Sequence, residues 1–150
     1  MSARALTIGE RIQTLGMCPV FTGVAPDGLA LLAEMLETER YRAGEAVFEC
    51  GDPSDRAFVV ASGSLSVCVP GQPTPVRTLG PGDLVGEYGM FSGMTRTATL
   101  RAAADAVLLS LEYPRFRAFL LQCPEGALVL LKAAVERLVA AERRQGVEGG

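Results

Sequence analysis

The residues with the most suitable chemistry for binding a ligand lie in the glycine-rich segment 86–99. Glu87 is acceptor-only when ionised, which suits a hydroxyl group that must donate. Arg96 carries a planar, permanently charged fork suited to phosphate. Between them, residues 88–91 are long enough for one helical turn, which would offer backbone N–H groups to an anion, and Gly89 would let that backbone come close. One short segment could therefore hold a phosphate and a sugar hydroxyl together.

The same residue types also fit a plainer structure, a hairpin with a wide loop and a surface ion pair between Glu87 and Arg96. Chemistry alone leaves both interpretations open. The glycines at 80, 82 and 86 do not indicate a dinucleotide-binding fold, because their spacing differs from G-x-G-x-x-G and no long helix follows.

The order of residue types through this segment is more specific than any one of them. Gly-Glu at 86–87, Gly-x-x-x-Gly at 89–93 and Arg-Thr-Ala-Thr at 96–99 resemble the phosphate-binding cassette of the cyclic nucleotide-binding domain family. That family includes catabolite activator proteins, protein kinase A regulatory subunits and cyclic nucleotide-gated channels. The resemblance covers roughly residues 15–144, and it includes the Ala-Gly-Glu at 43–45 and the turn at 51–55.

The resemblance implies a role for each matching position. Glu87 would bind the ribose 2′-hydroxyl and Arg96 the cyclic phosphate of cAMP or cGMP, with no metal. Arg137 falls where some members reach from the final helix towards the base, although an exposed helix charge is an equally good interpretation. The other positions expected to bind ligand are the backbone of Gly86, Tyr88 and Gly89, the side chain of Thr97, and the apolar Val67, Val76 and Leu79, which would pack against the purine or simply fill the barrel.

The sequence departs from the family pattern in three respects. Ala141 and Glu142 replace the hydroxyl pair that the catabolite activator uses on adenine, and Tyr88-Gly89 replaces the commoner Leu-Ala. No residues remain for a helix-turn-helix or a kinase-inhibitory segment, so we expect a sensor that acts on an output domain or partner outside this sequence. The Leu-Gly-Pro-Gly stretch at 79–82 and Arg137 resemble most the bacterial potassium-channel branch.

Length and composition predict a single domain over residues 1–150, with a core at about 15–144 and a flexible tail at 145–150. The net charge of −3 argues against a nucleic-acid partner. No apolar run is long enough to span a bilayer and the N-terminus is not a secretory signal, so we expect no membrane insertion of this chain and a cytoplasmic location. The four scattered cysteines fit reduced thiols.

The absence of histidine counts against an enzyme, because the chain lacks the commonest general base and the usual ligand of a metal site. A cupin-like barrel enzyme, which shares the strand pattern, would need such metal ligands. The nearer alternative is a structural or protein-interaction module whose nucleotide pocket is degenerate.

The hydrophobic pattern predicts an α+β, mainly β fold: an eight-stranded antiparallel jelly-roll barrel flanked by N-terminal and C-terminal helices. Helices are expected over 6–15 and 26–36, from Pro114, and from Pro124 to about Arg144. The expected strands are 38–41, 46–49, 57–61, 64–69, 76–79, 84–85, 97–102 and 106–111.

The last helix carries an apolar stripe at nearly heptad spacing, formed by Leu128, Leu131, Val135 and Leu138. It could pack against its own barrel, close over a ligand as a lid, or form a homodimer seam. The resemblance implies that ligand draws the 86–97 cassette inward and that the C-terminal helices then reposition to signal.

Overall fold

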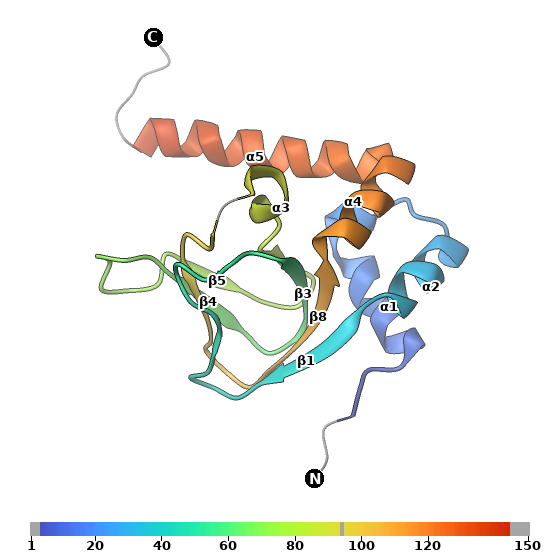
Figure 1. The fold of residues 1–150 in the computed structure, drawn as a ribbon, viewed down its shortest axis with the longest axis horizontal. Helices are drawn as coiled ribbons and strands as arrows, with labels where there is room; N and C mark the ends of the chain where they lie inside the picture. Colours follow the sequence, from blue (N-terminus) through green and yellow to red (C-terminus); the bar gives the residue numbers. More distant parts are fainter. Residues whose placement is uncertain (1–3, 94, 145–150) are drawn as a thin grey trace.

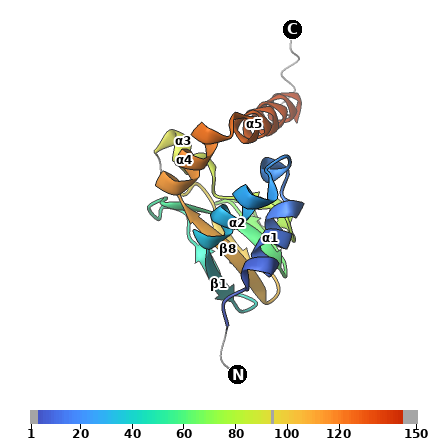
Figure 2. The ribbon, with the colours of Figure 1, turned by 90° about the vertical axis from the view of Figure 1, so that its right-hand side faces the viewer.

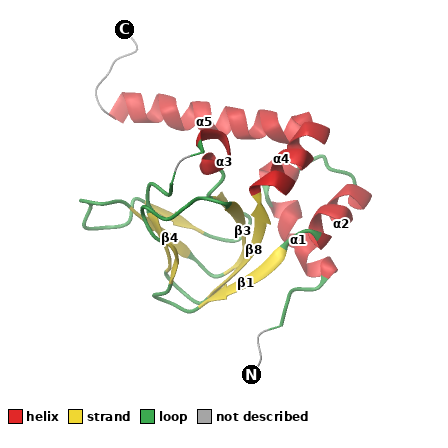
Figure 3. Ribbon diagram, viewed as in Figure 1, coloured by secondary structure: helices red, strands yellow, loops and turns green. Residues whose placement is uncertain are grey.

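The computed structural model describes residues 4–93 and 95–144 of the chain. Eight antiparallel strands form two four-stranded sheets, ordered β1-β8-β3-β6 and β2-β7-β4-β5. Helices lie before and after them in sequence, so the predicted α+β jelly-roll architecture is confirmed (Figure 3). The expected tail at 145–150 lies outside the described residues.

The strands differ from the predicted ones by only a few residues at their ends. Their bounds are β1 Glu37–Tyr41, β2 Ala46–Phe48, β3 Arg56–Ser62, β4 Leu65–Cys68, β5 Arg77–Leu79, β6 Leu84–Val85, β7 Thr99–Ala102 and β8 Ala106–Glu112. The interior between the two sheets is filled by side chains such as Phe58, Val60, Leu65, Leu100 and Leu108, each with an exposed fraction of at most 1 %.

The N-terminal helices begin where the sequence provides a start signal. Helix α1 (Ile8–Met17) starts after Thr7, whose side chain accepts from the backbone N–H of Glu10 while the Glu10 carboxylate accepts from the backbone of Thr7. Helix α2 (Pro26–Glu34) starts with a proline, whose missing N–H would have no partner in a first turn. The short 3₁₀ helix η1 (Pro19–Phe21) connects them. A second core forms where these helices and α4 (Tyr113–Gln122) pack against strands β3 and β8.

The C-terminal helices α4 (Tyr113–Gln122) and α5 (Pro124–Arg144) meet at a sharp bend of 111°. Helix α5 lies across one end of the barrel and contacts the short helix α3 (Tyr88–Ser92), and the remaining helices lie beside the sheets (Figures 1 and 2). Gly126 permits the close crossing of α5 on η1, because a Cβ at this position would lie 2.9 Å from the Val20 carbonyl oxygen.

No single helix among the described residues has the length and apolar composition needed to cross a membrane. Only α4 and α5 taken together meet that criterion, as the bent pair described above.

Candidate functional site: a cavity beneath the last helix

The predicted ligand-binding segment lines a cavity of about 260 Å³ between the barrel, α3 and α5. That volume is just below the usual range of small-molecule sites, about 300–1,000 Å³. Of the ten residues expected to bind ligand, eight line this cavity: Val67, Gly86, Glu87, Tyr88, Gly89, Arg96, Thr97 and Arg137.

Arg96 is placed by backbone pairing rather than by a regular element. Its N–H donates to the Asp52 carbonyl and its own carbonyl accepts from the N–H of Gly51, each at 2.8 Å, so it is tied to the turn before β3. The residue is 6 % exposed, and its guanidinium lies over the ring of Phe48, with Cζ 4.1 Å from the ring centroid. This stacking fixes the plane of the guanidinium.

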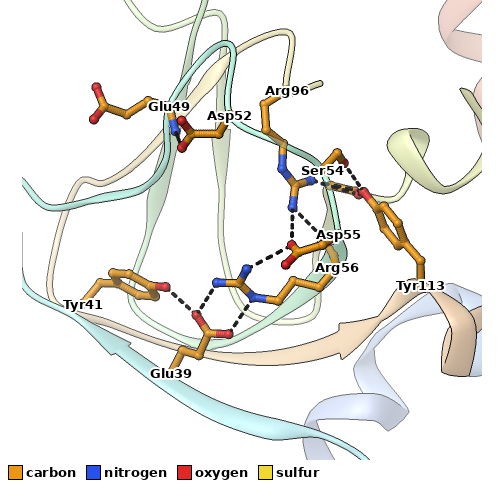
Figure 4. A network of polar contacts seen from close by, with 10 residues as sticks. Glu39, Tyr41, Glu49, Asp52, Ser54, Asp55, Arg56, Arg96 and Tyr113 are labelled. Atoms are coloured by element: carbon orange, nitrogen blue, oxygen red, sulfur yellow. Dashed lines mark hydrogen bonds and ion pairs between the residues drawn. The ribbon is translucent and has the colours of Figure 1, made fainter. Parts of the chain in front are cut away.

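The edges of the Arg96 guanidinium contact several fixed groups (Figure 4). Nη1 donates to the Gly86 carbonyl and to the Tyr113 hydroxyl, each at 3.2 Å, and Nη2 donates to the Arg56 carbonyl at 2.7 Å. Asp55 is an ion-pair partner, at 3.8 Å from Nη2. Burial lowers the pKa of Arg96, since removing a cation from water disfavours its charged form.

Nε of Arg96 is different from the terminal nitrogens. Within residues 4–93 and 95–144 it is the one buried side-chain nitrogen or oxygen without a hydrogen-bond partner. A buried donor without a partner costs about 1–3 kcal/mol. A buried cation with a spare donor fits a site for an anion such as phosphate.

Glu87 lies at the start of the same segment and is also 6 % exposed. Burial raises the pKa of its carboxyl, and the positive charges of Arg137 and Arg77 partly oppose that shift. The alternative of a Glu87–Arg96 surface ion pair is wrong, because both side chains are buried and Arg96 pairs with Asp55. The cavity therefore presents a cation and a carboxylate as separate binding groups.

Two glycines let the backbone of the segment come close to these groups. Gly86 has a φ of +83°, and a Cβ there would lie 2.8 Å from Nη1 of Arg96. A Cβ at Gly89 would lie 2.0 Å from Oγ of Ser54. A larger residue at Gly86 would push the segment away from Arg96, and one at Gly89 would push it away from Ser54.

Arg137 extends from α5 to the mouth of the cavity. Its Cζ lies 5.5 Å from the centroid of the Tyr88 ring, and Nη1 donates to the Tyr88 hydroxyl. Helix α5 is thus joined to the ligand-binding segment by a direct contact between two residues that line the cavity.

The structure does not bring the other two expected residues to the cavity. Val76 precedes β5 and is 49 % exposed, and Leu79 is 3 % exposed within the barrel core. Arg77 lines the cavity instead. Arg77 on β5 pairs with Val67 on β4, which also lines the cavity. Leu79 pairs with Leu65, two residues further along both strands and within the barrel core.

Sequence reasoning also missed side chains from other elements that contact Arg96, as Phe48 and Tyr113 do, or that bond to such a contact, as Ser54 bonds to Tyr113. Phe48, Ser54 and Tyr113 come from three separate parts of the chain. The pairing of Arg56 with Glu112, across β3 and β8, places Tyr113 beside Ser54 and Asp55. Knowledge of this strand pairing, which is not local in sequence, would have been needed to identify Ser54 and Tyr113.

A larger groove, of about 820 Å³, lies between α2 and α4 and is lined mostly by apolar side chains. It has no comparable pair of buried, opposite charges among its described residues, so it is the weaker candidate for a polar ligand. No group of three or more His, Cys, Asp or Glu side chains that could hold a metal ion occurs in the part of the chain that the structure describes.

Comparisons with known proteins agree with this geometry. Residues 38–123 match the family model described as "Cyclic nucleotide-binding domain". The chain is 37 % identical over 129 residues to a cyclic nucleotide-gated potassium channel of Mesorhizobium japonicum, a match that covers 86 % of this chain and 35 % of the channel. It is 26 % identical over 129 residues to a CRP-like cAMP-activated global transcriptional regulator of Mycobacterium tuberculosis, which covers 84 % and 58 % respectively.

Among solved structures, the catabolite activator protein of Thermus thermophilus superposes with a TM-score of 0.77 at 29 % identity, over 86 % of this chain and 62 % of that one. The chain thus spans about a third of the channel and less than two thirds of both the M. tuberculosis regulator and the T. thermophilus protein. The family match includes Glu87, Arg96 and the short helix between them. The chain therefore belongs to the cyclic nucleotide-binding domain family.

Proposed function

We propose that this chain is a regulatory domain that binds a cyclic nucleotide, with cAMP as its working ligand, and that it has no catalytic role. The observation that carries the proposal is the buried Arg96, whose Nε has no partner among the described residues, in the same cavity as the buried Glu87. A cyclic nucleotide matches this pair, because it joins an anionic phosphate to a ribose hydroxyl that can donate.

Each lining residue then has a defined task. Arg96 binds the cyclic phosphate and Glu87 accepts from the ribose 2′-hydroxyl. Gly86, Tyr88 and Gly89 contribute backbone around the phosphate and sugar. Val67 packs against the purine, and Thr97 and Arg137, which also line the cavity, contact the phosphate or base.

The choice between the two cyclic nucleotides depends on the base. Thr97 is exposed at the cavity, so its hydroxyl can reach a guanine amino group if the base is syn. One relative is named as cAMP-activated, which supports cAMP for this chain. We expect cGMP to bind as well.

The output we propose is a bacterial cyclic nucleotide-regulated potassium channel, with this domain on the cytoplasmic side. The support is the 37 % identity to a channel of which the chain spans about a third. The rest of the assembly, including the output domain, would lie outside this chain.

Signalling would proceed through the contacts at the cavity. Phosphate bound to Arg96 draws the 86–97 segment inward, and Tyr88 moves with it. Because Tyr88 contacts Arg137, the segment and α5 move together and α5 closes over the base. Ligand then acts by favouring this closed arrangement over an open one.

A homodimer through α5 is a further part of the proposal. Leu128, Leu131, Val135 and Leu138 are 48–64 % exposed, so the heptad stripe faces away from the barrel, and its packing on the barrel is excluded. A stripe at this spacing fits the same stripe of a second copy.

Titration calorimetry of the unmodified protein with cAMP, cGMP and adenosine tests the proposal. Saturable binding of cAMP with weak or absent binding of adenosine would support it, because only cAMP carries the phosphate for Arg96. Absence of heat with both cyclic nucleotides at millimolar concentration would instead favour an interaction module that uses the α5 stripe.

A further inference from the structure

The Tyr113 hydroxyl lies at the meeting point of four segments of the chain (Figure 4). It contacts the Gly86 carbonyl, Nη1 of Arg96 at 3.2 Å and Oγ of Ser54 at 2.5 Å. Tyr113 is the first residue of α4, and its backbone N–H donates to the Asp55 carbonyl at 3.1 Å. Both ends of the residue are thus attached to the ligand-binding region.

The hydrogen-bond donors in this cluster can be assigned from chemistry. The Gly86 carbonyl can only accept, so the single Tyr113 proton goes to it. The hydroxyl oxygen must then accept from Arg96 and from Ser54. The hydroxyl thus donates one hydrogen bond and accepts two, which is all that it can form. None of these bonds involves the aromatic ring.

These bonds restrain one side of the Arg96 guanidinium. Nη1 donates to Gly86 and to Tyr113, whereas Nε has no partner within the described residues. In arginine, Nε–H and one N–H of Nη2 point the same way and form a fork, while Nη1 lies on the other side. Nη2 also donates to the Arg56 carbonyl at 2.7 Å, so Nε–H is the part of this fork that has no partner within the described residues. Tyr113 holds the opposite side of the guanidinium, at Nη1.

We infer that Tyr113 is a positioning residue for phosphate binding, which acts through Arg96 and links the cassette to the start of α4. This inference rests on the proposed function. Fixing the guanidinium before the ligand arrives reduces the ordering cost of binding, and this raises affinity without any contact between Tyr113 and ligand. Because the Tyr113 hydroxyl is bonded to both Arg96 and Gly86, a displacement of either residue would also displace the first residue of α4.

The surrounding glycines support a specific role for the hydroxyl. A Cβ at Gly89 would lie 2.7 Å from the Tyr113 oxygen as well as against Ser54. The segment therefore passes the hydroxyl at a distance that only glycine permits. Tyr113 is 8 % exposed, so its ring also packs in the core, and a test must keep the ring.

The test is a double-mutant cycle with Tyr113→Phe and Arg96→Lys, measured as cAMP affinity by calorimetry. Loss of one hydrogen bond to a charged group predicts about a ten- to 150-fold weaker affinity for Tyr113→Phe. In the Arg96→Lys background the same substitution should change affinity by less than about twofold, because lysine has no Nη1 to position. The matched control is Tyr41→Phe, whose hydroxyl donates to Glu39 rather than contacting Arg96, and it should leave affinity unchanged.

A measurement on ligand-free protein separates this inference from the proposed function. Nitrogen-15 NMR of the Arg96 guanidinium should show slower rotation about the Cζ–Nη1 bond in the unmodified protein than in Tyr113→Phe. If the unmodified protein binds no cyclic nucleotide, the proposed function fails and this arm alone decides the role of Tyr113. Unchanged guanidinium rotation, or an equal loss of affinity from Tyr113→Phe with and without Arg96→Lys, would overturn the inference.

Discussion

Arg137 on α5 and Tyr88 on α3 are in direct contact, although they are 49 positions apart in sequence. The guanidinium carbon is 5.5 Å from the ring centroid, and Nη1 donates to the phenol hydroxyl. Tyr88 stands where the family more often has leucine, which could not accept this hydrogen bond. The contact gives the last helix a polar attachment to the ligand-binding segment.

The first prediction concerns this attachment. Arg137→Ala should weaken cAMP binding by about five- to thirtyfold, mainly through faster dissociation, because a lid acts after encounter. Tyr88→Phe keeps the ring and loses only the hydrogen bond, so it should have a smaller effect of the same kind. Stopped-flow release of a fluorescent cyclic nucleotide measures the dissociation rate.

Arg143→Ala is the matched control, since it removes an exposed charge from the last turn of the same helix. It should leave the dissociation rate unchanged. A normal dissociation rate in Arg137→Ala would reduce α5 to a packing or dimerisation element.

The second prediction follows from the buried carboxyl of Glu87. Its folded-state pKa is raised above the unfolded value by burial, so this group stabilises the fold at low pH and loses that contribution as pH rises through the folded pKa. Glu87→Gln removes the titrating charge. We expect the variant to gain stability relative to the unmodified protein at pH 7, and the gain to shrink as pH falls towards the usual carboxyl range near 4.5. Chemical denaturation of both proteins across this pH range measures the difference.

Binding should change in the opposite direction. The amide is a weaker acceptor than a carboxylate, so Glu87→Gln should bind cAMP about five- to fifteenfold more weakly. The loss should be much smaller with 2′-deoxy-cAMP, which lacks the hydroxyl that Glu87 would accept from. Equal losses for both nucleotides would remove Glu87 from the ribose site.

Much of the architecture could be predicted from the sequence because it depends on local signals. Pro26, Pro114 and Pro124 mark helix starts, and turn residues separate strands of period two, so most elements begin or end within a few residues of the predicted bounds. The segment with Glu87 and Arg96 was found for the same reason, since its residues are close together in sequence.

Features that depend on strand pairing or on the direction in which a side chain points were predicted less well. Val76 and Leu79 were expected near the purine. The alternation of side chains along a strand does not say which residue of β5 reaches the cavity, and in the structure that residue is Arg77. The spacing of the α5 stripe likewise predicts a stripe but not the side on which it lies. Tyr113 and Phe48 reach Arg96 through sheet pairings that no local pattern encodes.

The third prediction concerns nucleotide choice. Thr97→Ala should weaken cGMP binding by roughly two- to tenfold, the value of about one neutral hydrogen bond, and should leave cAMP nearly unchanged. Competition of both nucleotides against one fluorescent ligand gives the two affinities under the same conditions. Equal losses would mean that Thr97 serves the phosphate and not the base.

The fourth prediction concerns the exposed stripe of α5. If the stripe is a dimer seam, Leu131→Glu should convert a dimer into a monomer in sedimentation-equilibrium experiments, because each seam would bury unpaired carboxylates. Lys132→Glu reverses the charge at the neighbouring exposed position and should preserve the dimer. A monomer in the unmodified protein at high concentration would contradict the seam.

The central claim is that Arg96 holds the phosphate of a cyclic nucleotide, and calorimetric titration of Arg96→Ala with cAMP tests it most directly. Truncating one side of a buried charged pair costs ~2–5 kcal/mol, which predicts roughly a 30-fold to few-thousandfold loss of affinity. Arg101→Ala, which removes an exposed arginine on β7, should bind as the unmodified protein does. Unchanged cAMP affinity in a folded Arg96→Ala protein would contradict the assignment of this site.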